Sequence, residues 1–195
     1  MTFESVYTTS AAFDNLLMTS DGKVLTGLHF AKSRKAAEPN KALPIFKDVS
    51  RWLDIYFSGR EPDFTPDFRI DNATPFRKNI LEILSHIPFG KVLTYGEIAQ
   101  TIAERNGLAK MSAQAVGGAV GWNPICIIIP CHRVIGANNK LTGYGGGIEN
   151  KLALLRLEGA LTLERPTFRP ASPTLLSRAG RKPPECPHHA THGRL

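Results

Sequence analysis

Cys131 and His132 are neighbours in the stretch IIIPCHRVIG, residues 127–136, and their side chains are suited to nucleophilic chemistry. A thiolate is a strong nucleophile, and an adjacent histidine can accept the thiol proton or supply a positive charge. Most single cysteines are buried and inert, so the surrounding residues must indicate whether Cys131 is reactive. Pro130 cannot continue a strand ladder, so we predict a strand that ends there and presents Cys131, with Cys126 inside it as a core residue.

His132 needs a partner if it is to act on the sulfur. Neighbouring residues of an extended strand point to opposite faces, so we expect His132 to reach Cys131 only through a turn or a bridging water. Glu158 stands in the last turn of a predicted helix, directly before Gly159, where the helix dipole disfavours an acid. Glu158 is therefore a candidate partner of His132, although a solvated surface glutamate explains it equally well.

The composition indicates a globular protein. The 195-residue chain is 42% hydrophobic, which is enough for a core. Its three cysteines have no paired spacing, and the N-terminus lacks a basic stretch followed by an apolar run. The longest apolar runs are far shorter than the roughly 20 residues that span a bilayer. We expect a reduced, cytoplasmic protein with no membrane segment.

The net charge of +7 lies largely in the C-terminal tail, where residues 165–195 carry six basic residues and one acidic residue. The same tail holds six of the fourteen prolines and has no apolar periodicity, so we expect residues 166–195 to be disordered. Its CPHHATH stretch matches no standard metal-ligand spacing, so no metal site is predicted. The remaining positive charge is compatible with DNA binding but does not demonstrate it.

Residues 1–72 read as a small α+β domain. FDNLLMTSDGKVLTGLHF predicts two strands joined at Asp21 and Gly22, and ESVYTTS predicts a third. A helix is predicted by apolar residues at helical spacing, namely Phe46, Val49, Trp52, Leu53, Tyr56 and Phe57. The proline-rich stretch GREPDFTPDFRIDNATP then behaves as a linker.

Residues 73–165 read as a second, mostly helical domain. Thr74 and Pro75 suit the start of a helix. In TYGEIA, Thr94 and Glu97 have capping-box spacing, which places Tyr95 in a rigid first turn. Ser112 can cap a further helix, AQAVGGAVG, and two helices with a short connection favour a helix-turn-helix.

The helix AQAVGGAVG carries almost no large side chains, and two explanations stay open. One is close packing on another helix. The other is approach to DNA, because a helix is about 10–12 Å wide and the B-DNA minor groove only about 6 Å. A nucleotide-binding loop is disfavoured, because GGAVG matches neither common glycine-rich phosphate motif.

Five segments in order, TYGEIA, AVGGAVGWNP, PCHRVIG, GYGGG and LLRLEG, resemble those of the methylated-DNA–protein-cysteine methyltransferases. The PCHRV signature is highly specific. The resemblance covers residues 75–160 closely and the N-terminal domain loosely, and the tail lies outside it. It implies an α+β fold: a small antiparallel sheet domain that is ribonuclease H-like, followed by a winged-helix-like domain that carries the site.

The resemblance implies a catalytic role for five residues. Cys131 is expected to take the alkyl group from O6-alkylguanine, with His132 as the base acting through water and Glu158 orienting that histidine. Tyr95 is expected to move the target phosphate and to donate to the leaving purine. Asn123 is expected to brace the turn that holds the active-site strand.

The resemblance also implies that the chain binds double-stranded DNA as a monomer, without cofactor or metal, flips the base and acts once. The residues expected at the DNA are Thr94, Tyr95, Gln114, Ala115, Gly117 and Gly118. Those expected around the extruded base are Tyr95, Tyr144, Gly145 and Gly146, and Arg133 is expected to be a buried structural residue. Gln114 departs from the family, most of which has an arginine finger there.

Two other classes of function stay open. A cysteine hydrolase would use the same cysteine and histidine but would turn over repeatedly on an acyl substrate such as a thioester. A DNA-binding regulator would use the same helices and would not need the cysteine. The preference for alkyl size and activity on O4-methylthymine are likewise open.

Overall fold

The computed structural model describes residues 1–31 and 43–160. The predicted tail, with its cysteine and histidines, lies outside these residues. In the described part of the chain, no helix is long and apolar enough to cross a bilayer, and no group of three or more His, Cys, Asp or Glu residues could hold a metal ion.

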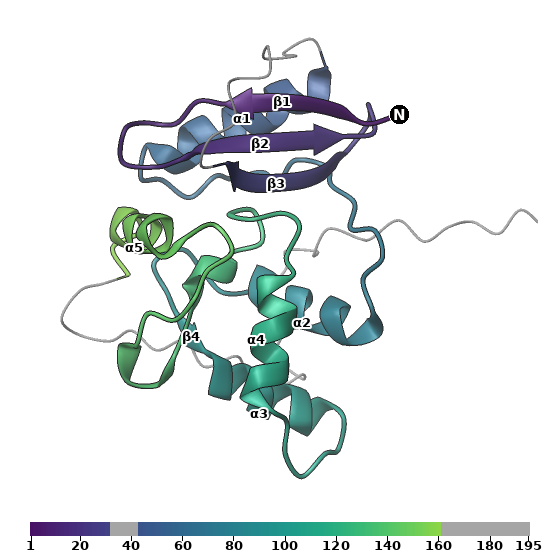
Figure 1. Cartoon of the computed structure of the whole chain (residues 1–195), viewed down its shortest axis with the longest axis vertical. Coiled ribbons are helices and arrows are strands. Elements are labelled where there is room, and N and C mark those ends of the chain that lie inside the picture. Colours follow the sequence, from purple (N-terminus) through teal and green to yellow (C-terminus); the bar gives the residue numbers. More distant parts are fainter. Residues whose placement is uncertain (32–42, 161–195) are drawn as a thin grey trace, which may run out of the picture.

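The N-terminal part is a three-stranded antiparallel sheet with one helix against it (Figure 1). Its strands are β1 (Phe3–Tyr7), β2 (Asn15–Ser20) and β3 (Leu25–Ala31), in that order across the sheet, and the helix is α1 (Pro44–Phe57). The apolar positions of α1 are buried, as its helical spacing predicts. The three strands and the helix predicted from the sequence are confirmed.

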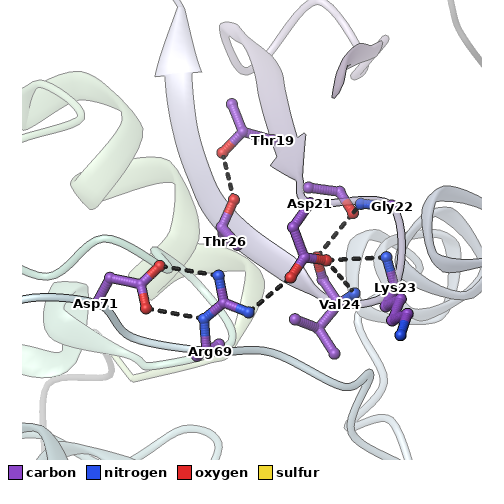
Figure 2. A network of polar contacts seen from close by, with 9 residues as sticks. Thr19, Asp21, Gly22, Lys23, Val24, Thr26, Arg69 and Asp71 are labelled. Carbon is purple, nitrogen blue, oxygen red and sulfur yellow. Dashed lines mark hydrogen bonds and ion pairs between the residues drawn. The ribbon is translucent and has the colours of Figure 1, made fainter. Parts of the chain in front are cut away.

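The turn between β2 and β3 is built around Asp21, as Figure 2 shows. Its Oδ1 atom accepts hydrogen bonds from the N–H groups of Lys23 (2.9 Å) and Val24 (3.0 Å), and its Oδ2 atom lies 2.6 Å from Arg69 Nη1. Gly22 has a φ of 104°, which suits glycine. The predicted turn at Asp21 and Gly22 therefore forms, and Arg69 attaches the linker to it.

The outer edge of β3 is covered by two other parts of the chain. Leu25 exchanges backbone hydrogen bonds with residues 67–69. Leu28 donates its N–H to the carbonyl of Pro124 and accepts from the N–H of Cys126, both at 2.9 Å. Residues 124–126 thus extend the sheet beside β3, which ties the segment leading to Cys131 to the N-terminal part.

The second part is mostly helical and in Figure 1 lies on the β3 side of the sheet. Its elements are α2 (Pro75–Ser85), β4 (Leu93–Thr94), α3 (Tyr95–Arg105), α4 (Ala113–Gly121), the 3₁₀ helix η1 (Cys131–Arg133), β5 (Val134–Ile135), the 3₁₀ helix η2 (Ala137–Asn139) and α5 (Ile148–Leu157). Strands β4 and β5 pair in parallel.

The three helix starts predicted from capping residues are confirmed. The hydroxyl of Thr74 accepts from the N–H of Arg77 at the start of α2, and Ser112 caps α4. At α3, Thr94 and Glu97 bond each other's backbone N–H groups, which makes a complete capping box. Tyr95 is consequently the first residue of a firmly anchored helix.

The largest hydrophobic core is continuous across the two parts. It joins residues of β2, β3 and α1 with residues of α2, α3, α4 and the segment before Cys131. The chain is thus a mixed α+β protein whose two parts share buried surface. The boundaries at residues 72 and 165 stay predictions.

Candidate active site

The segment before Cys131 is a turn, so the predicted strand ending at Pro130 is wrong. The N–H of Ile129 bonds the carbonyl of Ile125 at 3.0 Å, and Ile127 between them has a φ of 68°. This left-handed conformation is unfavourable for a β-branched residue. Backbone groups that a regular strand would pair with a neighbour instead close the turn, and Cys131 begins η1.

Asn123 holds this turn through its buried amide. Its Nδ2 atom donates to the carbonyls of Ile129 (2.7 Å) and Ile125 (3.4 Å) and to the Cys131 sulfur (3.1 Å). Its Oδ1 atom accepts from the N–H of Ile125 at 3.1 Å. One side chain therefore fixes the shape of the turn and directs a donor at the sulfur.

His132 is fully buried, and Glu158 orients it. The Nε2 atom of His132 lies 2.7 Å from Glu158 Oε1. A carboxylate can only accept, so we assign the imidazole proton to Nε2, which leaves Nδ1 as the acceptor atom. That Nδ1 atom is buried and has no hydrogen-bond partner among the described residues. The site therefore contains a base with one unused acceptor position.

Glu158, at the end of α5, receives donors from several directions. Arg133 donates to both carboxylate oxygens at 2.9 and 3.0 Å, Tyr56 donates its hydroxyl at 2.5 Å, and Gly90 its N–H at 3.3 Å. Burial acts to raise the pKa of Glu158, but His132 and then Arg133 outweigh it and hold the pKa well below its usual range. Glu158 is thus a buried carboxylate and not a surface one.

The pKa shifts favour a neutral thiol and a neutral imidazole at pH 7. Burial raises the pKa of Cys131, while the Asn123 hydrogen bond and the charge of Lys151 act in the opposite direction. Burial lowers the pKa of His132, against the pull of Glu158. His132 is consequently available as a proton acceptor rather than as a resting cation.

Two residues of the site were not predicted from the sequence as functional. Lys151 is fully buried, donates its ammonium to the carbonyls of Val134 (2.6 Å) and Thr142 (3.3 Å), and has its pKa lowered by burial to about 8. It shares the inward face of α5 with Glu158, so its helical spacing was an available signal. Tyr56 was read only as core, although a buried phenol hydroxyl usually requires a partner.

A cavity of about 1060 Å³ lies in front of Cys131. Its walls come from β3, the start of α3, one side of α4 along its length, the turn after α4, and two segments after Cys131, residues 136–137 and 142–146. The predicted residues that line it are Tyr95, Gln114, Gly117, Asn123, Cys131, Tyr144, Gly145 and Gly146. Cys126, which we predicted to be core, is buried and also contributes to the wall.

The remaining predicted residues lie around this cavity. His132, Arg133 and Glu158 are buried and do not line it. Thr94 uses its hydroxyl in the capping box of α3. Ala115 and Gly118 are exposed on α4 and do not line the cavity.

The loop at Tyr144 closes against the N-terminal sheet. The Tyr144 ring meets Phe30 of β3 and His132 edge-on, with centroids 6.3 and 6.5 Å apart. A Cβ atom at Gly146 would lie 2.5 Å from the Phe30 ring and 2.7 Å from the Tyr144 ring, so any side chain there would displace these rings. Part of the cavity wall therefore depends on β3.

The small residues of α4 serve both sides of the helix. Val116, Ala119 and Val120 are buried against the core, as the packing explanation requires. A Cβ atom at Gly117 would lie 3.8 Å from the Tyr95 ring, whereas one at Gly118 would have no neighbour within 4 Å. Close packing therefore explains part of the composition and leaves Gly118 unexplained.

Residues 75–160 match the family described as 6-O-methylguanine DNA methyltransferase, DNA binding domain, and residues 5–71 match its ribonuclease-like domain. The chain belongs to this family. A methylated-DNA–protein-cysteine methyltransferase of Methanosarcina mazei is 44% identical over 148 residues, which cover 73% of this chain and 89% of the relative. The relative of that name from Haemophilus influenzae is 41% identical over 147 residues, or 73% of this chain and 79% of its own.

Solved structures of the family have the same fold. A crystal structure of Mycobacterium tuberculosis OGT in complex with DNA superposes with a TM-score of 0.67 at 37% identity, covering 80% of this chain and 92% of that one. A structure of the O6-methylguanine methyltransferase from the same organism covers 91% and 99%, with a TM-score of 0.66 and 35% identity. The predicted α+β class is confirmed, while the winged-helix-like description stays a prediction.

Proposed function

We propose that this chain repairs DNA by moving the alkyl group of O6-alkylguanine to the sulfur of Cys131. The observation that carries the residue assignment is the arrangement at the cavity floor. The Cys131 sulfur accepts from Asn123 there, and His132, the next residue of the same 3₁₀ helix, is bonded to the buried Glu158 and keeps an Nδ1 atom that no described residue bonds. Family membership supports the reaction.

In the proposed reaction, the sulfur attacks the alkyl carbon, an S–C bond forms and the C–O6 bond breaks. The thiol proton passes to Nδ1 of His132 through a water, and the guanine leaves with the electron pair on O6. Tyr95, on the cavity wall, donates its hydroxyl proton to the leaving purine and is reprotonated from water, to which His132 later releases the thiol proton. Proton transfers of this kind typically accelerate a reaction by about 10²–10⁴. Alignment of sulfur, carbon and oxygen supplies the remainder.

The base must leave the DNA stack, because the side chain of Cys131 is buried and O6 of a stacked guanine cannot reach it. Gln114, Ala115 and Gly118 are exposed on α4, and these small or slender side chains suit a minor groove only about 6 Å wide. We therefore assign α4 to the minor groove and Gln114 to the gap in the stack. Tyr144, Gly145 and Gly146 enclose the extruded base.

Each molecule acts once, because the product is a thioether and water does not cleave it.

The two cysteines of the described residues are free thiols, which fits a reducing compartment such as the cytoplasm.

The test is a mass spectrum after incubation with a duplex that contains O6-methylguanine. We expect about 14 Da, one methyl in place of hydrogen, on the peptide that carries Cys131. Cys131→Ala should bind the lesion and remove nothing, whereas Cys126→Ser should still transfer. Methyl on Cys126, more than one lesion repaired per molecule, or repeated hydrolysis of a generic thioester would each refute the proposal.

A further inference from the structure

Tyr56 belongs to α1 of the N-terminal part, yet its hydroxyl lies within the buried polar group behind Cys131. It donates to Glu158 Oε1 at 2.5 Å and lies 3.3 Å from His132 Nε2. The side chain is 1% exposed. The N-terminal part therefore supplies a polar atom to the group that orients the proposed base.

The aromatic ring of Tyr56 is held on several sides. It stacks on Trp52 with centroids 5.4 Å apart and meets Phe57, Phe89 and His132 edge-on at 5.5, 5.9 and 6.4 Å. These contacts fix the direction of the hydroxyl. A phenylalanine would make the same ring contacts, so packing does not explain the hydroxyl.

Glu158 Oε1 is shared by three donors, which are Tyr56, His132 Nε2 and Arg133 Nη2. Each donor draws negative charge from the carboxylate, so the donation from Tyr56 weakens the attraction of Glu158 for a proton on the imidazole. The other titratable or charged groups close to His132 are Cys131, Tyr144 and Lys151.

We propose that Tyr56 is a positioning residue for alkyl transfer: by donating its hydroxyl to Glu158 Oε1, it shares that oxygen with His132 Nε2 and limits the negative charge that the imidazole meets. His132 then keeps its proton on Nε2, stays neutral near pH 7 and can accept the thiol proton at Nδ1. This inference rests on the proposed function, and it gives α1 a part in the chemistry.

The experiment is Tyr56→Phe, which keeps the ring and removes the donor. With less competition for Oε1, Glu158 should hold a protonated His132 more strongly, so the imidazole pKa measured by ¹⁵N NMR should rise by about 0.5–1 unit. The acidic limb of the pH profile of the single-turnover rate, measured on methylated duplex, should move to higher pH by the same amount. The rate should fall about 3–10-fold below that pKa and change less than about twofold at pH 8.5.

Tyr7→Phe is the matched control, because Tyr7 also donates its hydroxyl to a carboxylate, Asp54 at 2.8 Å, and also packs on Phe57. It should leave both the His132 titration and the rate profile unchanged. Melting temperatures of both variants report their folding. If Tyr56→Phe lowers the melting temperature while the titration and the limb stay in place, Tyr56 is only a core residue and the proposal is wrong.

A second variant decides the matter if Tyr56→Phe does not fold. Replacing Tyr56 with 3-fluorotyrosine strengthens the donor and should move the titration and the limb downward; no movement or an upward shift would refute the proposal. The titration of His132 needs no substrate. If the wild type transfers the methyl group but the Tyr56 variants leave the pKa of His132 unchanged, this inference alone is contradicted. If the wild type transfers no methyl group, the proposed function is contradicted.

Discussion

At the scale of single residues, Glu158 is the acceptor on which the buried donors behind Cys131 converge. It neutralises Arg133, orients His132 and is reached by Tyr56. Removing one partner of a buried ion pair is costly, because the other partner stays buried and charged. The stability of the fold and the proposed activity therefore both depend on the Glu158 carboxylate.

Glu158→Gln should lower the free energy of unfolding by about 3–5 kcal/mol at pH 7, because Arg133 loses its counter-charge. The pKa of Glu158 is held below its unfolded value, so its contribution is present above about pH 4 and is lost as the pH falls further. Urea unfolding at pH 7 and below pH 4 should show the difference from wild type shrinking in acid. Glu149→Gln, exposed on the same helix, should change stability by less than about 1 kcal/mol. An equal loss for the two variants would contradict the assignment.

At the scale of elements, local rules were sufficient for the helices and the sheet. Thr74, the Thr94 capping box, Ser112 and the Asp21 turn each act through neighbours in the sequence, so their consequences could be predicted. The turn before Cys131 could not, because its backbone bonds Leu28 of β3, and no pattern near Ile127 announces a positive φ.

The residues of the site also divide into those that the sequence indicated and those that it did not. Glu158 was a candidate partner of His132 because an acid at a helix end is anomalous, but a surface glutamate explained its position equally well, and only the family resemblance favoured the pair. Lys151 and the hydroxyl of Tyr56 were missed because an isolated lysine and an apolar stripe have ordinary explanations. The role of Tyr56 depends on packing between α1 and α5, which local spacing does not encode, whereas the helical spacing of Lys151 relative to Glu158 was a signal that went unused.

Two substitutions at Gly118 of helix α4 can separate an effect on stability from an effect on DNA binding. Gly118→Ala should raise the free energy of unfolding by about 0.5–1 kcal/mol, because glycine is a poor helix former and the added Cβ atom meets nothing. Gly118→Leu should stay folded but bind methylated duplex at least about tenfold more weakly, because a wide side chain does not fit the minor groove.

Fluorescence anisotropy and thermal unfolding measure these two effects. Gln100→Leu, on the exposed face of α3, is the control for an added apolar side chain and should leave duplex affinity unchanged. Equal affinity for the Gly118→Leu variant and wild type would remove α4 from the groove.

At the scale of the whole molecule, hydrogen bonds from the N-terminal part support the site in three places. Leu28 bonds the turn, Tyr56 reaches Glu158, and Asp14 is joined to Asn150. Asn150 also donates to the carbonyl of Gly146 at 2.7 Å, so its amide links the loop over the cavity to Asp14, which directly precedes β2.

This link predicts a coupling between Asp14 and Asn150. The Asn150 Nδ2 atom lies 2.7 Å from Asp14 Oδ2, and the N–H of Asp14 donates to Asn150 Oδ1 at 3.0 Å. A double-mutant cycle with Asp14→Ala and Asn150→Ala should give a coupling of about 1–2 kcal/mol in urea unfolding. Hydrogen exchange of residues 143–147 should be faster in Asn150→Ala. Strictly additive losses, with unchanged exchange, would show that the Asp14–Asn150 link does not couple the loop to the N-terminal part.

The contacts that support the site join distant points of the chain, and this has a consequence for biosynthesis. Tyr56 and Glu158 are 102 residues apart, and Asp14 and Asn150 are 136 apart. Pairings over such separations form late, because their loop-closure entropy must be overcome first. The N-terminal sheet leaves the ribosome early and can fold while the rest is still being made. Until residue 158 has emerged, His132 lacks the carboxylate that orients it, so the arrangement around Cys131 is complete only after nearly all of the described chain has been translated.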